Sequence, residues 1–114
     1  MMEATTDKEL MMRNEMRVIA DMKGLLAHDS ADGLRWRGTR TDLIEMVHIL
    51  YESCEIRDED GLPIAFNRLV ERCCRVLGEK VPRNPCTYLS HARQCQGVKR
   101  APLLLRYKGG MVGY

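Results

Sequence analysis

Residues 34–56, LRWRGTRTDLIEMVHILYESCEI, decide how this chain folds. The stretch carries the only tryptophan, Trp36, and then a run of patterned apolar residues. Thr39 followed three residues later by Asp42 is a variant of the helix-capping box. Apolar residues then recur at the i, i+4, i+7, i+8 and i+11 positions that place them on one helical face: Leu43, Val47, Leu50, Tyr51 and Cys54. The pattern predicts an amphipathic helix over about residues 39–55.

Trp36 lies between two arginines on a short extended lead-in to this helix. Because side chains alternate along an extended chain, Arg35 and Arg37 point away from the side that Trp36 faces. Burying such a ring removes on the order of 150–250 Å² from water, which stabilises the fold by a few kcal/mol at ~25 cal/mol per Å². One isolated aromatic cannot build a base-stacking platform. We therefore expect Trp36 to pin the helix start rather than to bind a ligand.

A second helix is predicted upstream, where Thr6 and Glu9 form a Ser/Thr-x-x-Glu capping box. Its apolar stripe consists of Met12, Met16, Ile19, Met22 and Leu26. We expect this stripe to be core, and the alternative is a dimer seam lined by flexible methionines. Residues 1–33 are interpreted as an N-terminal helix with its connection, and residues 34–114 as the main domain.

Two further helices are predicted downstream. The first has Pro63 near its start and Gly78 at its left-handed end. Its apolar stripe is Leu62, Phe66, Leu69, Val70, Cys73 and Leu77, and its opposite face carries Asn67, Arg68, Arg72 and Arg75. The second has Asn84 as N-cap and Pro85 as first residue, and it ends at Gly97. Tyr88, Leu89, Ala92 and Cys95 should face inward from it.

The C-terminal tail has two readings. Pro102 can start a short helix through Tyr107, or residues 103–107 and 111–114 can pair as a hairpin. We favour the short helix. The predicted fold class is therefore mainly α, a small bundle of four to five helices of winged-helix or helix-turn-helix type. It allows at most a short strand near residues 34–37 or a C-terminal hairpin.

The composition indicates a soluble cytoplasmic protein. The chain has 114 residues, 45% hydrophobic and 30% charged, without an apolar run of the ~18 residues that a membrane span needs and without a secretory signal at its start. Residues 1–60 hold 8 Lys and Arg against 14 Asp and Glu, a net charge of −6, whereas residues 61–114 hold 10 against 2, a net charge of +8. The basic half is expected to face an anionic partner, for which nucleic acid is the commonest candidate, or to attract the acidic half.

Catalytic and metal chemistry find little support in the sequence. The five cysteines (Cys54, Cys73, Cys74, Cys86 and Cys95) are expected to be reduced thiols, mostly packed on apolar faces. Cys86, His91 and Cys95 lack the paired spacing of a zinc site, so no metal is expected. A phosphate-binding loop, an H-E-x-x-H motif and a nucleophile elbow are all missing. The prediction is a non-enzyme without a cofactor, a small-molecule substrate or a membrane partner.

The spacing W-x-G-x-x-x-D-L-I-E over residues 36–45, continued by Leu50 and Tyr51, resembles the C-terminal domain of the RteC family, regulators found on conjugative transposons. The resemblance runs from about Leu34 to Tyr107 and includes Phe66, Tyr88 and the basic pair Lys99 and Arg100. It implies that residues 34–114 form a winged-helix-like module that binds DNA upstream of genes controlling excision of a mobile element.

The leading hypothesis is therefore a small regulator that binds duplex DNA through the basic half. The helix near residues 85–96 would approach the major groove while neighbouring cations hold phosphates. The candidate DNA-binding residues are Lys80, Arg83, Thr87, Ser90, His91, Arg93, Gln94, Lys99, Arg100, Arg106 and Lys108. The alternative is an interaction module whose acidic, Met-rich first helix docks on a partner or on the basic half of a second copy without contacting DNA. A homodimer that also reads DNA is compatible with both.

Overall fold

The computed structural model describes residues 6–95 and 103–113, and at Ser30 and from residue 91 to residue 95 it describes the backbone alone. The predicted fold class of a small, mainly helical bundle is confirmed. In chain order, its elements are α1 (Asp7–Leu26), a 3₁₀ turn (Ser30–Asp32), β1 (Arg35–Trp36), α2 (Arg40–Glu52), α3 (Phe66–Leu77), α4 (Pro85–Cys95), α5 (Leu103–Arg106) and β2 (Val112–Gly113).

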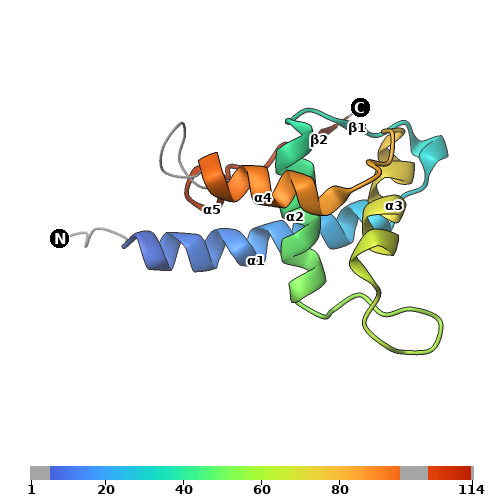
Figure 1. Cartoon of the computed structure of the whole chain (residues 1–114), viewed down its shortest axis with the longest axis horizontal. Helices are drawn as coiled ribbons and strands as arrows, with labels where there is room; N and C mark the ends of the chain where they lie inside the picture. Colours follow the sequence, from blue (N-terminus) through green and yellow to red (C-terminus); the bar gives the residue numbers. More distant parts are fainter. Residues whose placement is uncertain (1–5, 96–102, 114) are drawn as a thin grey trace.

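Helix α2 is the centre of the bundle. It packs against α1, α3 and α4, and Figure 1 shows α4 crossing over it while α1 passes behind. Because three helices cover α2, its buried face is wider than the predicted stripe and includes Ile44 and Met46. Leu43, Val47 and Leu50 are buried as predicted. The prediction was wrong for Tyr51, which is 37% exposed at the last turn, and for Cys54, which is exposed beyond the helix end.

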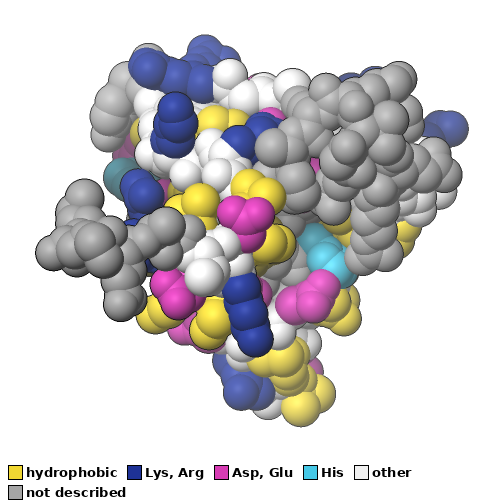
Figure 2. Space-filling view, turned by 90° about the vertical axis from the view of Figure 1, so that its left-hand side faces the viewer, with side chains coloured by type: hydrophobic (Ala, Val, Ile, Leu, Met, Phe, Trp, Pro, Cys, Tyr) yellow, Lys and Arg dark blue, Asp and Glu magenta, His cyan; other side chains and the backbone are white. Residues whose placement is uncertain are grey.

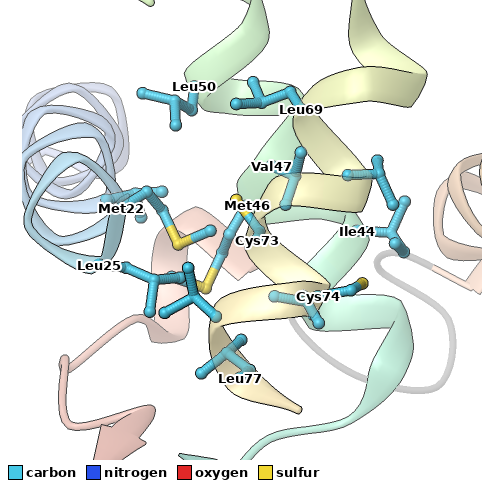
Figure 3. Packing of buried hydrophobic residues seen from close by; sticks show 14 of the residues in the cluster. Met22, Leu25, Ile44, Met46, Val47, Leu50, Leu69, Cys73, Cys74 and Leu77 are labelled. Carbon is cyan, nitrogen blue, oxygen red and sulfur yellow. The ribbon is translucent and has the colours of Figure 1, made fainter. Parts of the chain in front are cut away.

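One apolar cluster joins the helices. Side chains of α1, α2 and α3 meet in its middle (Figure 3), so the segment before residue 34 packs into the same core as the rest. The fully buried large side chains are Met22, Leu43, Ile44, Met46, Leu50, Leu69 and Leu77, with Val18, Val47, Val70, Asn14 and Cys73.

The predicted helix boundaries are largely confirmed. The Thr6 hydroxyl accepts a hydrogen bond from the Glu9 backbone N–H at 3.1 Å, and the Thr39 hydroxyl accepts one from the Asp42 N–H at 3.0 Å. Gly78 ends α3 with φ +67°, and Pro85 begins α4.

The start of α3 differs from the prediction. The helix begins at Phe66 rather than near Pro63, because Pro63 is engaged in an isolated antiparallel bridge with Arg57. Leu62 therefore precedes the helix and is 61% exposed, so its assignment to the core was wrong.

Trp36 pins the start of α2 as predicted. Its ring packs against the core, and its indole Nε1–H donates to the Thr39 carbonyl oxygen at 2.8 Å. Gly38 completes the arrangement, since a Cβ there would lie 3.2 Å from the Trp36 ring and would collide with the terminal methyl of Met111. The W-x-G spacing thus has a packing reason.

The buried face of α1 differs from the predicted stripe. Asn14, Val18, Met22 and Leu25 face inward, and the Asn14 Nδ2–H donates to the Leu104 carbonyl oxygen at 2.6 Å. Positions two residues away lie about 200° around a helix. Met12 and Met16 are accordingly 58% and 73% exposed, and their assignment to the core was wrong.

The C-terminal tail forms the favoured short helix, α5, which packs on α1. The alternative hairpin between residues 103–107 and 111–114 was wrong, because β2 instead pairs with β1 in antiparallel register, Arg35 opposite Gly113 and Trp36 opposite Val112. The strand predicted near residues 34–37 is confirmed. The two ends of the described main domain are thereby tied together.

Candidate nucleic-acid interface

A groove of about 470 Å³ opens between the first turn of α2 and the segment that leads into α4. Its cations come from both sides: Arg40 is the first residue of α2, while Lys80 and Arg83 belong to the α3–α4 connection. The complete lining is Arg40, Lys80, Val81, Pro82, Arg83, Asn84, Thr87 and Tyr88.

Local sequence explains the walls of this groove. Pro82 and Pro85 disfavour helical backbone at the residues before them, so the chain stays irregular until α4 begins. Pro85 then takes the first helical position, which does not require an N–H donor. The Thr87 backbone N–H donates to the Asn84 carbonyl oxygen at 3.1 Å and closes the first turn. On the other wall, the Thr39 cap places Arg40 at the start of α2.

The groove is electropositive. Lys80 and Arg83 are exposed, and the Arg40 guanidinium is 4.0 Å from the Glu79 carboxylate, with both side chains more than a third exposed. An exposed ion pair at that separation is weak. The N-terminal ends of α2 and α4 lie at the groove, and their helix dipoles favour negative charge there. This arrangement suits anionic oxygens such as those of a phosphate.

The structure brings three of the predicted DNA-binding residues together, since Lys80, Arg83 and Thr87 line the same groove. Ser90 is exposed one turn further along α4. The other predicted positions of that half, namely the side chains of His91, Arg93 and Gln94 and the residues Lys99 and Arg100, lie outside the part of the chain that the structure describes.

Arg106 has a different environment from the one predicted. Its guanidinium donates to both carboxylate oxygens of Asp42, at 3.2 and 2.6 Å, and the Asp42 side chain is only 4% exposed. The hydrogen bonds to Asp42 raise the pKa of Arg106 above its usual value. Arg106 thus ties α5 to the start of α2 and does not line the groove.

Lys108 is also separate from the groove. It is exposed beside α1, where its carbonyl oxygen accepts a hydrogen bond from Arg17 at 3.4 Å.

Sequence reasoning missed Arg40 and Tyr88 as groove residues. Arg40 lies 40 positions before Lys80, and only the packing of α4 across α2 brings them together. Tyr88 was expected inside, whereas it is half-buried and lines the groove. No local pattern in the sequence points to either assignment.

Part of the remaining basic surface lies close to acidic side chains. The predicted exposed face of α3, with Arg68, Arg72 and Arg75, is confirmed. However, Arg72 and Arg75 share a hollow of about 210 Å³ with Asp29. At the end of the molecule where α1 begins, basic, acidic and hydrophobic side chains are interspersed (Figure 2).

The four thiols that the structure describes differ in their exposure. Cys73 and Cys74 are buried, Cys54 and Cys86 are exposed, and all four are free. Burial raises the pKa of the Cys73 thiol to about 12, so it stays protonated near neutral pH. Among the described side chains, no three His, Cys, Asp or Glu residues gather closely enough to hold a metal ion.

Comparison with known proteins identifies no relative: no family model, curated protein or solved structure matches this chain. Within the described residues, no helix combines the length and the apolar character that crossing a membrane requires.

Proposed function

We propose that this protein is a small, non-enzymatic regulator that binds duplex DNA through the groove at the start of α4. The observation that carries the proposal is the convergence of Arg40, Lys80 and Arg83 on one groove. Cations from two separate elements that face the same hollow can contact successive phosphates, which supplies most of the affinity in non-specific DNA binding.

The groove lies at the N-terminal end of α4, which supports a role for α4 as the DNA-reading helix. In helix-turn-helix proteins the N-terminal residues of the recognition helix contact base edges, while surrounding groups position the protein on the backbone. Thr87 and Ser90 are exposed in the first half of α4 and can donate or accept hydrogen bonds. When the basic groove of the protein contacts the phosphates, the N-terminal half of α4 enters the major groove of the DNA. The resemblance to the RteC family adds the proposal that the target controls excision of a mobile element.

The first test is the salt dependence of binding to a duplex from the chain's own upstream region. Each phosphate neutralised contributes a slope of about −0.9 in log K against log salt. Three groove cations therefore give a slope near −2.7 and an affinity loss of roughly 40-fold between 50 and 200 mM salt. Fluorescence anisotropy at four salt concentrations measures it. An affinity that does not change with salt would contradict the proposal.

Charge reversal locates the surface. We expect the variant K80E/R83E to reduce the magnitude of the salt slope by about 2 and to weaken binding at 100 mM salt more than tenfold, because two phosphate contacts are lost. The matched control is K8E/R13E, which makes the same charge change on exposed positions of α1. Equal losses in the two variants would show that net charge alone, rather than the groove, governs binding.

A second candidate function is association with another copy through α1. The exposure of Met12 and Met16 favours it, because large apolar side chains on a helix surface often mark an interface. The first turn of α1 carries Asp7 and Glu9, which complement the basic half of a second copy. We propose this pairing as the alternative to DNA binding.

Replacing Met12 and Met16 distinguishes a role in self-association from a role in the hydrophobic core. We expect M12Q/M16Q to change the free energy of unfolding by less than about 0.5 kcal/mol, since neither side chain is buried, and to weaken self-association about tenfold. Urea denaturation and sedimentation equilibrium measure the two effects. Wild-type protein that remains monomeric at all concentrations would eliminate the candidate.

A further inference from the structure

A second cavity, of about 340 Å³, lies between α1 and the C-terminal segment, away from the basic groove. Its apolar floor consists of Met22, Leu25, Leu34 and Met46, all at most 7% exposed. Asp21, His28 and Tyr107 supply its polar groups. Ligand sites in proteins are hollows of roughly 300–1,000 Å³ with an apolar lining and a few placed polar groups. This cavity fits the lower end of that range.

The roof of the cavity is the C-terminal segment with Tyr107, Gly110, Met111 and Val112, and contacts at both of its ends hold it in place. The Tyr107 hydroxyl donates to the Asp21 carboxylate of α1, and burial raises the pKa of the Tyr107 phenol, so it remains a donor. Further along, the Arg37 backbone N–H donates to the Met111 carbonyl oxygen at 2.8 Å, and β2 pairs with β1. The cavity is therefore already formed in the folded chain, and binding does not require the ordering of a loop.

The polar side of the cavity is dominated by one carboxylate. The Asp21 carboxylate accepts a hydrogen bond from the Tyr107 hydroxyl, and its remaining lone pairs can accept one from a further donor. His28 is already engaged, with its Nδ1 2.9 Å from the Asp32 carboxylate. Arg17, which precedes Asp21 by four residues in α1, lies over the Tyr107 ring at 6.0 Å and donates to the Lys108 carbonyl oxygen. It does not line the cavity.

We propose that this cavity binds a small amphipathic amine, with its apolar body on Met22, Leu25, Leu34 and Met46 and its ammonium group on Asp21. A cavity of about 150 Å³ holds benzene, so one of this size accommodates a body of roughly ten non-hydrogen atoms. A charge-assisted hydrogen bond to Asp21 selects a cation over a neutral or anionic head group. This inference is independent of DNA binding.

The test compares three probes of similar shape: 2-phenylethylamine, 2-phenylethanol and phenylacetate. The ¹³C-labelled methionine methyl groups report the site, because Met22, Met46 and Met111 line the cavity while Met12 and Met16 are exposed on α1 and serve as internal controls. We expect 2-phenylethylamine to shift the three lining methyls and to bind about tenfold more tightly than the alcohol. Phenylacetate should bind most weakly because Asp21 repels it.

Two variants assign the contacts. Asp21→Asn keeps an acceptor for Tyr107, and we expect it to abolish the preference for the amine, whereas the matched control Glu15→Gln, on the exposed face of α1, should keep it. Gly24→Leu should fill the cavity and weaken all probes, since Gly24 lines it and a Cβ there has no atom within 4 Å. Circular dichroism confirms that each variant folds.

Three results would overturn the proposal: no shift of the lining methyls at 10 mM amine (roughly the weakest affinity that such a small ligand gives), equal affinity for amine and alcohol in the wild type, or a preference that survives Asp21→Asn. A loss of DNA binding in K80E/R83E leaves this measurement unchanged, so the two proposals fail separately.

Discussion

Replacing Arg106 with methionine is expected to lower the free energy of unfolding by about 3 kcal/mol, because it removes the cation from a buried ion pair. Arg106 contacts both oxygens of Asp42, and the Asp42 side chain is 4% exposed. Without the guanidinium, a carboxylate remains in the interior with fewer partners and cannot regain its water. Urea denaturation at neutral pH measures the loss.

The double variant D42L/R106M distinguishes the pair from its parts. Replacing a buried ion pair with apolar residues is often close to neutral, so we expect the double variant to be more stable than R106M alone by at least about 1 kcal/mol. Lys108→Met is the control, since Lys108 is exposed two residues away. If the stability losses of D42L and R106M, each measured alone, simply add in the double variant, the ion pair contributes no coupling energy.

Truncating Leu69 should have an effect of similar size. Leu69 is 0% exposed in α3 and contacts the central cluster (Figure 3), and replacing a buried leucine with alanine costs about 2–5 kcal/mol through lost burial and the cavity left behind. We expect about 3 kcal/mol for Leu69→Ala in urea denaturation, which is a large share of the ~5–15 kcal/mol typical of a domain.

Leu62→Ala is the matched comparison. Both leucines lie on the stripe that the sequence predicts, but Leu62 is 61% exposed before the helix starts. Its truncation should change stability by less than about 0.5 kcal/mol. Equal losses at the two positions would mean that α3 begins earlier than Phe66.

The features that could be predicted from the sequence depend on neighbours three or four residues apart. The Thr6 and Thr39 caps, the left-handed end at Gly78 and the start of α4 at Pro85 involve local hydrogen bonds or the backbone preference of one residue. Trp36 belongs with them, because its Nε1–H reaches the carbonyl of Thr39 three residues on. Such contacts join residues close in the sequence, so a local pattern is enough to predict them.

The candidate sites could be predicted only in part. Lys80, Arg83 and Thr87 were expected together because they are close in sequence, whereas Arg40 joins them through the crossing of α4 over α2. Arg106 was expected at a phosphate because it belongs to the basic half of the chain. Its partner Asp42 lies 64 residues earlier, in the acidic half. No local sequence pattern predicts the proposed amine cavity, since its floor comes from residues 22–46 and its roof from residues 107–112.

The sequence by itself determined most of the helix ends and that Trp36 would secure the central helix, because these follow from short-range hydrogen bonding and backbone preference. The start of α3 at Phe66 is an exception, since it depends on the bridge between Pro63 and Arg57. Only the tertiary structure decided which faces are covered. Asn14 is buried and Met12 exposed because the Leu104 carbonyl, 90 residues further on, supplies the acceptor that makes a polar residue tolerable inside. Hydrophobicity ranks the residues, but the segment packed against each face decides their burial.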